Sequence, residues 1–322
     1  MRRIHFHLLA SAVLIMCGCS KNIPVPGYTA GYTIYFAGQS GSYAAYWKNG
    51  QQINLANNAE AYAITLSDTN LYISGSQYLG EHETATYWKN GQQVQLESTG
   101  TSHAFGIQVS NDDVYCIGDF FGPPNSGRDT AVYWKNGKRT ALSPLSNGIA
   151  RSIYVSGSTL YIAGQVWGIF DSAVVWKNGV QTWYATSGSM NAIGISASDI
   201  YFVGNYNGAT YWTETRFKTL NYRGFAGSIA VNGADVYIGG GVNDSLGNSH
   251  ACYWKNDLYI PLTNNYKSSV VNAIAIAGSD VYAGGYIYDG AKDVPVYWRN
   301  GVMTKLSGQG EVNAVCIKKE YP

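Results

Sequence analysis

The sequence predicts an all-β fold, a seven-bladed β-propeller of four-stranded blades whose first blade is closed by the C-terminal strand. Three observations predict it: a Trp-containing repeat that recurs seven times, hairpin turn signals inside the repeats, and a C-terminal segment that matches the first strand of the repeat unit. Repeats of this length are typical of propeller blades.

The repeat is marked by a Trp that follows Tyr or Val, and successive copies stand 36 to 46 residues apart. The seven copies are Tyr46-Trp47, Tyr87-Trp88, Tyr133-Trp134, Val175-Trp176, Tyr211-Trp212, Tyr253-Trp254 and Tyr297-Trp298. Asn-Gly follows in five of them, whereas copy five reads Thr213-Glu214-Thr215 and copy six has Asn256-Asp257. Asn-Gly favours a two-residue hairpin turn because both turn residues must take positive φ. We therefore expect a hairpin after most of the Trp strands.

A second hairpin precedes each Trp, and the ends of the chain predict closure of the ring. In the last copy, Gly278-Ser279-Asp280 separates an alternating strand at 272–276 from another at 281–285. Each unit thus holds four strands within about 42 residues. The second strand of the unit occurs seven times, beginning at 33–37, but the seventh first strand is found only at 313–317. Because an open array would leave an unpaired edge, we expect this strand to complete the first blade.

The packing pattern also predicts a radial arrangement. One position of the first strand always holds a small residue, namely Ala63, Gly106, Ser152, Ala192, Ser228, Ala273 and Ala314. Close-packed side chains near the axis of a ring must be small. The seven Trp repeat in step with the strands, which favours packing between blades over a sugar-binding ring.

Composition agrees with short strands and tight turns. The 322 residues include 27 Tyr and 38 Gly, and only 13% are charged. Tyr is enriched in strands and Gly in turns. The formal net charge is +1, and no run of Lys or Arg follows the first residues. A nucleic-acid surface requires a basic patch, so we expect no nucleic-acid partner.

The N-terminus has the features of an export signal. Met1-Arg2-Arg3 is followed by a short apolar stretch and then by Gly18-Cys19. A small residue before Cys at this place resembles the lipobox of bacterial lipoproteins. The resemblance implies a signal peptide at 1–18, a lipidated Cys19, a linker at 19–30 and a propeller at 31–322. An ordinary secretory peptide is the alternative. We expect a lipoprotein of the bacterial cell envelope, and Ser20 favours the outer membrane, with the periplasmic or surface side left open.

Two groups of extracellular repeats share these motifs. Trp-x-Asn-Gly-x4-Leu followed by a small-Ile strand resembles the HAF repeats, and Gly-Gly at the end of a strand, as at Gly239-Gly240, is similar to kelch propellers. Most copies lack the double Gly, and the His-Ala-Phe opening of HAF repeats survives only as variants such as His250-Ala251-Cys252. The resemblance implies an exported propeller and carries no active site over.

The remaining cysteines indicate neither disulfides nor a metal. Cys116, Cys252 and Cys316 each fall inside a predicted strand of a different repeat. Buried free thiols behave as small apolar residues. The sequence has no Cys-x-x-Cys and no Cys/His cluster, so we expect no metal and no cofactor.

The candidate ligand site lies on the loops after the second strands, which vary most in length and should open on one face. Ligand contacts in propellers are usually made by such loops. The candidate ligand-binding residues are Trp167, Phe170, Phe120, Phe121, Asp119, Tyr78, His82, Tyr206, Tyr286 and Tyr288. A loop aromatic can also fold back to cap its blade. A mostly polar ring near the channel mouth either binds a ligand or is simply solvated; it comprises Gln39, Ser76, Asp119, Gln165, Asn205, Gly241 and Tyr286.

These features favour a membrane-anchored binding or interaction module, for a glycan or a protein, over an enzyme. No Ser/His/Asp order, phosphate loop or calcium loop is present, so no catalytic residue is predicted. The first alternative is a polysaccharide hydrolase or lyase that uses the loop carboxylates and the run Glu81-His82-Glu83. The second is a structural protein of the envelope.

Overall fold

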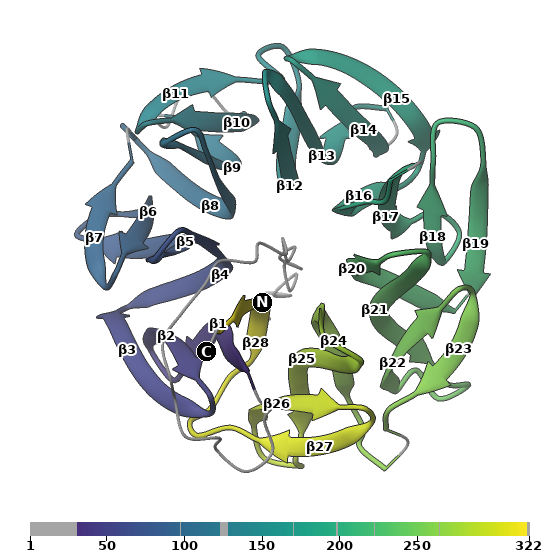
Figure 1. Cartoon of the computed structure of the whole chain (residues 1–322). Helices are drawn as coiled ribbons and strands as arrows, with labels where there is room; N and C mark the ends of the chain where they lie inside the picture. Colours follow the sequence, from purple (N-terminus) through teal and green to yellow (C-terminus); the bar gives the residue numbers. More distant parts are fainter. Residues whose placement is uncertain are drawn as a thin grey trace.

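The computed structural model describes residues 31–322 apart from 97, 123–127, 170, 198, 222, 264 and 321–322. Seven antiparallel sheets of four strands stand in a ring, with the first strand of each blade nearest the axis (Figure 1). This arrangement confirms the seven-bladed β-propeller. In the described part of the chain, no helix has the length and apolar character that spanning a bilayer requires.

The strands follow the chain blade by blade. Blade 1 contains β1 (Tyr32–Ser40), β2 (Tyr43–Lys48), β3 (Gln51–Asn57) and β28 (Val312–Lys319). Blade 2 contains β4 (Ala59–Ser67), β5 (Asn70–Leu79), β6 (His82–Lys89) and β7 (Gln92–Gln95). Blade 3 contains β8 (Thr101–Ser110), β9 (Asp113–Phe121), β10 (Asp129–Lys135) and β11 (Lys138–Ala141). Blade 4 contains β12 (Asn147–Ser156), β13 (Thr159–Trp167), β14 (Ser172–Lys177) and β15 (Val180–Thr186).

The other three blades have the same order. Blade 5 contains β16 (Ser189–Ile195), β17 (Ile200–Asn205), β18 (Ala209–Trp212) and β19 (Phe217–Asn221). Blade 6 contains β20 (Gly224–Asn232), β21 (Asp235–Asn243), β22 (Ser249–Lys255) and β23 (Leu258–Pro261). Blade 7 contains β24 (Ser269–Ala277), β25 (Asp280–Tyr288), β26 (Asp293–Arg299) and β27 (Val302–Lys305).

The C-terminal strand closes the ring, as the sequence predicts. β28 pairs antiparallel with β1, with Ile34 opposite Ile317 and Tyr35 opposite Cys316. The two ends of the propeller therefore lie side by side in blade 1 (Figure 1). This pairing covers the edge of β1 and makes β28 the innermost strand of blade 1, the place that the first strand takes in every other blade.

The Asn-Gly turns form as predicted, and the Asn side chain explains why the motif recurs. Asn49 and Gly50 take φ values of 47° and 82°, which suit a turn of the hairpin type. The Asn49 Oδ1 atom also accepts a hydrogen bond of 2.9 Å from the backbone N–H of Ile34, at the start of the second strand. Five other blades repeat this bond through Asn90, Asn136, Asn178, Asn256 and Asn300. The turn thus joins three strands of its blade.

The recurrent Trp side chains form the packing between blades. Six of them are 0–1% exposed, and Trp212, which has no Asn-Gly turn, is 4% exposed. Trp176, for example, packs with Ile149, Ile162 and Val174 in a cluster that also contains residues of blades 2 and 3. The interpretation of these residues as core is confirmed. The thiols of Cys116, Cys252 and Cys316 are buried and free, also as expected.

A bulge in the first strand of every blade gives the second-strand glycine its role. The register shifts once in each of these strands, as between Ala104 and Gly106 of β8. At the bulge a backbone carbonyl approaches the second strand so closely that a Cβ on Gly118 would lie 1.8 Å from the His103 oxygen. The same contact, at 1.8–2.0 Å, occurs at Gly38, Gly75, Gly164, Gly204, Gly240 and Gly285. Only glycine fits these seven positions.

Gly118→Ala is therefore expected to lower the free energy of unfolding by about 3 kcal/mol, because a backbone atom cannot move aside as a side chain can. Urea unfolding followed by circular dichroism measures the change. Gly168→Ala is the matched control, since a Cβ there meets nothing within 4 Å. Equal stability of the two variants would contradict the assigned role of the bulge.

The propeller has two different faces. The turns between second and third strands, such as residues 80–81 and 244–248, lie on one face, which we call the loop face. The Asn-Gly turns and the start of β1 at Tyr32 lie on the opposite face. There the Lys or Arg before the turn lies over a Tyr ring of the second strand in six blades, as Lys89 does over Tyr72 at 5.4 Å.

Candidate functional site

The residue that the bulge leaves unpaired differs around the ring. In blades 5, 7 and 1 it is Asn191, Asn272 and Asn313. Each of these amides donates a hydrogen bond of 2.9–3.0 Å to a first-strand carbonyl of the next blade. In the three successive blades 2, 3 and 4 the position is instead occupied by Tyr62, Phe105 and Arg151. In blade 6 the position holds Gly227, so the three large side chains are confined to one sector of the ring.

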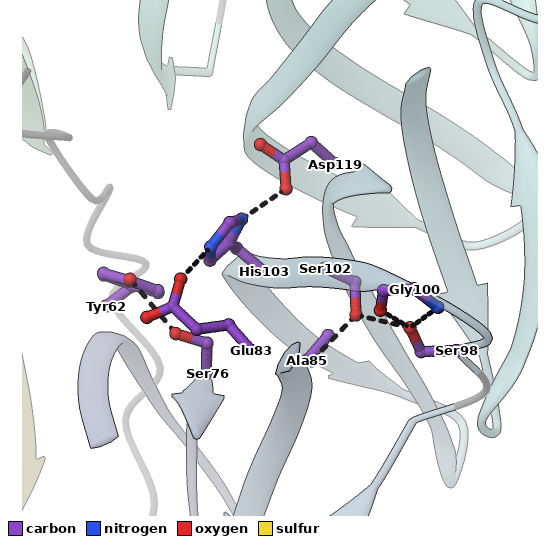
Figure 2. Close-up of polar contacts among 9 residues, drawn as sticks. All are labelled: Tyr62, Ser76, Glu83, Ala85, Ser98, Gly100, Ser102, His103 and Asp119. Carbon is purple, nitrogen blue, oxygen red and sulfur yellow. Dashed lines mark hydrogen bonds and ion pairs between the residues drawn. The ribbon is translucent and has the colours of Figure 1, made fainter. Parts of the chain in front are cut away.

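A charged cluster fills that sector. His103 of β8 lies between two carboxylates: its Nδ1 is 2.7 Å from Asp119 Oδ1 of β9, and its Nε2 is 2.8 Å from Glu83 Oε2 of β6 (Figure 2). The imidazole stacks on Phe105 at 5.4 Å between ring centres. The side chain of His103 is 21% exposed. Both nitrogens are therefore occupied, and the cluster joins blades 2 and 3.

The surroundings fix the charge of His103. Burial lowers the pKa of the imidazole, but the charge and hydrogen bonds of Asp119 and Glu83 outweigh it and raise the pKa to about 10. The hydrogen bond from His103 in turn lowers the pKa of Glu83. His103 is consequently a doubly protonated cation at neutral pH, and it cannot serve as a general base there.

Asp129 and Arg151 extend the cluster toward blade 4. Burial, and after it the nearby charge of Asp119, raises the pKa of Asp129 to about 7. Burial lowers the pKa of Arg151 to about 10, while the attraction of Asp119 and Asp129 opposes that change. Asp129 is thus a carboxyl group that gains and loses a proton near neutral pH, beside an acidic neighbour.

Two pockets open on the loop face at junctions between blades. The first has a volume of about 510 Å³ and lies between blades 4 and 5. Its lining residues are Gln165, Ile169, Asp171, Ser187, Gly188, Ser189, Asn205 and Asn207. The second has a volume of about 410 Å³, lies between blades 1 and 2, and is lined by Gln39, Ser42, Asn58, Ala59, Glu60, Tyr78 and Glu83. Three members of the predicted polar ring, Gln39, Gln165 and Asn205, line these pockets.

Some predicted ligand-binding residues lie at these features. Asp119 belongs to the His103 cluster. Tyr78 is 52% exposed and lines the pocket between blades 1 and 2. His82 is exposed at the start of β6, one residue before Glu83. Phe121 is 42% exposed at the end of β9.

Other predicted residues pack against their own blades. Trp167 is partly buried against the cluster that contains Trp176. The ring of Phe120 lies 3.5 Å from the Arg139 guanidinium. Tyr206 packs against the core of blade 5 and against Phe217. For Trp167, Phe120 and Tyr206, this is the capping arrangement that the sequence left open as the alternative.

Tyr286 and Tyr288 are the last two predicted ligand-binding residues that the structure describes. Tyr286 is buried, and its hydroxyl lies 3.3 Å from Ser268 Oγ. The Tyr288 hydroxyl donates to the Gly290 carbonyl of its own turn. Phe170 and Cys19 lie outside the described residues. The structure thus places the nine described members of the predicted set around the loop face without bringing them into one site.

A second pair of a histidine and a carboxylate lies in blade 6. His250 Nε2 is 3.2 Å from Asp244 Oδ2, and Asp244 also accepts hydrogen bonds from Asn248 and from the Leu246 backbone. These bonds, those of Asn248 first, lower the pKa of Asp244. Asp244 therefore caps its own turn. Within the described ranges, no group of three His, Cys, Asp or Glu residues could hold a metal ion.

The sequence analysis missed His103, Asp129, Arg151 and Glu60. A signal was present: at one first-strand position the repeat reads Glu311, Glu60, His103, Ile149, Ser189, Phe225 and Val270. Charged side chains there occur only in blades 1, 2 and 3. Departure from the repeat, rather than any motif, marks the cluster.

Comparison with known proteins identifies the fold class. No family model and no curated protein matches the sequence. A puromycin-hydrolyzing peptidase of Mycobacterium tuberculosis is 12% identical with a TM-score of 0.56, covering 85% of this chain and 53% of its own. Pyrococcus horikoshii acylaminoacyl peptidase is 10% identical with a TM-score of 0.51, covering 86% of this chain and 50% of its own. The chain thus spans about half the length of these two enzymes.

A third solved structure matches over most of both chains. The β-propeller domain of the Trilobed protease from Pyrococcus furiosus, described as having an open velcro topology, is 9% identical with a TM-score of 0.51. The match covers 87% of this chain and 95% of that domain. Such likenesses show the fold alone. The chain is a seven-bladed β-propeller, a fold compatible with a binding module.

Proposed function

We propose that the chain is a membrane-anchored, extracytoplasmic binding module that takes a glycan in the loop-face pocket between blades 4 and 5. One observation carries the proposal: polar groups line a concave space without being used by the fold. Among the described residues, the Gln165 amide, the Asp171 carboxylate and the Ser189 hydroxyl form no hydrogen bond with the rest of the protein. Amides, hydroxyls and a carboxylate suit the alternating donors and acceptors of sugar hydroxyls.

The backbone of this pocket supports the same proposal. Ser187 takes φ +62°, a left-handed conformation that residues other than Gly, Asn and Asp rarely adopt. Such outliers gather at binding sites, where the surrounding structure holds them in place. The volume of about 510 Å³ falls in the range of small-ligand pockets.

The position of the N-terminus fits an anchor of this kind. β1 begins at Tyr32 on the face opposite the loop face. A lipid on Cys19 would tether the propeller to a membrane through the segment that enters β1.

Glycan-array screening of the full chain in detergent, followed by calorimetry on the best hit, tests the proposal. We expect Gln165→Ala to weaken binding about tenfold, the loss of one or two hydrogen bonds to a ligand. Gln92→Ala is the matched control, because Gln92 is an exposed amide on β7 outside both pockets. No glycan bound by the array, or equal affinity of the two variants, would contradict this function.

A hydrolase is the second candidate, and one observation favours it. Asp129, whose pKa is raised to about 7, stands beside Asp119 like the proton donor of a carboxyl pair. If the chain cleaves a glycan that it binds on the array, and Asp129→Asn abolishes the cleavage, the hydrolase replaces the binding module as the function.

A further inference from the structure

The second pocket, between blades 1 and 2, differs from the first in its charge. Glu60 of β4 and Glu83 of β6 both line it. Glu83 Oε2 accepts from His103, whereas its Oε1 forms no hydrogen bond within the described residues. Among those residues, no Lys, Arg or His pairs with Glu60. Two carboxylates thus face one pocket of about 410 Å³ with only one of their four oxygens held by a cation.

Glu60 is surrounded by more negative than positive charge. Burial raises the pKa of Glu60, the hydrogen bond with Tyr62 counters this in part, the carboxylates of Glu83 and Glu311 raise the pKa further, and the charge of His103 makes the last and smallest contribution, which lowers it. A cation placed in the pocket would reverse the repulsion between these carboxylates. His103 does not pair with Glu60, since its two nitrogens are occupied by Glu83 and Asp119.

The other walls suit a sugar ring that carries the cation. Tyr78 is 52% exposed, stands opposite Glu83 in the strand pair and lines the same pocket. Aromatic rings attract cations within about 6 Å and also pack against apolar ring faces. Gln39 and Asn58 add amides that match sugar hydroxyls.

We propose that the pocket between blades 1 and 2 binds a 2-amino-2-deoxy sugar unit with a free ammonium group, held between the carboxylates of Glu60 and Glu83 and against the ring of Tyr78. This inference rests on the proposed glycan-binding function and names a ligand class for a second pocket. An N-acetylated sugar lacks the charge and would leave the carboxylates unpaired.

Binding of glucosamine oligomers, of N-acetylglucosamine oligomers and of a lysine-rich peptide to the full chain in detergent tests the inference by calorimetry. We expect the glucosamine oligomer to bind best. Glu60→Gln keeps the shape of the side chain and removes its charge, so it should weaken this binding about 10- to 100-fold, as for loss of a hydrogen bond to a charged group. Glu81→Gln, an exposed acid of the same face outside the pocket, is the control and should change affinity less than threefold.

Each outcome decides between the two proposals. Equal binding of free and acetylated oligomers, or unchanged affinity in Glu60→Gln, overturns the amino-sugar site while leaving the pocket between blades 4 and 5 intact. Binding of the lysine-rich peptide at least as tight as that of the glucosamine oligomer overturns the sugar as ligand and favours a basic protein partner. No binding of any glycan, charged or neutral, contradicts the proposed function itself. A thermal melt of Glu60→Gln that matches the parent excludes misfolding as the cause.

Discussion

Replacing His103 by Gln is expected to lower the free energy of unfolding by about 3–5 kcal/mol, the usual effect of removing one partner of a buried ion pair. The cost arises because Asp119 and Glu83 would then face each other without the cation that lies 2.7 and 2.8 Å from them. Asp119 is the more demanding of the two, since its side chain is only 9% exposed. Chemical denaturation at pH 7 measures the loss.

Two variants sharpen this experiment. His82→Gln changes an exposed histidine on the same blade edge and is expected to leave stability unchanged within about 0.5 kcal/mol. The double variant His103→Gln with Asp119→Asn should recover part of the loss, because it removes one of the unpaired charges. If His103→Gln proves as stable as His82→Gln, the cluster does not hold blades 2 and 3 together.

The pH dependence has a definite sign. The pKa of His103 is raised in the folded state from its ordinary value of 6.5 to about 10. Its contribution to stability is therefore complete below about pH 6.5 and is lost as the pH rises through 10. The parent chain should lose stability between pH 7 and 10, whereas His103→Gln should show a flatter profile over this window.

Asp129 is expected to add a loss of stability at lower pH. Its pKa is raised from 3.8 to about 7, so the folded state favours the protonated carboxyl. Stability from this group is present below about pH 4 and falls as the pH rises toward 7. Asp129→Asn should remove that part of the slope and leave the part between pH 7 and 10 that belongs to His103.

The symmetric part of this molecule could be predicted because its features recur along the sequence. The Asn49-type turns, the buried Trp residues and the closing strand at 313–317 each recur or complete a recurrence, so seven copies reinforce one interpretation. The turn chemistry is local, and Asn-Gly needs no knowledge of distant residues to be recognised.

The cluster around His103 could not be predicted in the same way, because its residues become neighbours only after the strands are paired. Glu83 and His103 stand on the outer and inner parts of different blades, and the bulge at Phe105 sets the position of the imidazole. The loop aromatics posed a different difficulty. Whether Trp167 points outward or packs against the cluster that contains Trp176 depends on a few kcal/mol of apolar burial, which the residue type alone does not decide.

Removing the C-terminal strand is expected to have the largest effect of all. A chain that ends at Glu311 lacks Val312, Val315 and Ile317, which are 0–1% exposed in the core of blade 1. At about 1.5–3 kcal/mol for each large apolar side chain, the loss approaches the whole stability of an ordinary domain. It also exposes β1 as an unpaired edge next to the axis. We expect loss of cooperative unfolding and aggregation in size-exclusion chromatography.

Closure is a property of this chain and not a requirement of the fold, since the β-propeller domain from Pyrococcus furiosus is described as having an open velcro topology. In this chain β28 supplies the complete inner strand of blade 1, and the Asn313 amide donates a hydrogen bond to the Ala61 carbonyl of blade 2. A peptide of residues 310–322 added to the shortened chain should restore the cooperative transition, because every partner of β28 remains in place. Cooperative unfolding of the chain ending at Glu311 at the parental midpoint would mean that six complete blades and a three-stranded seventh suffice, and that β28 contributes little to stability.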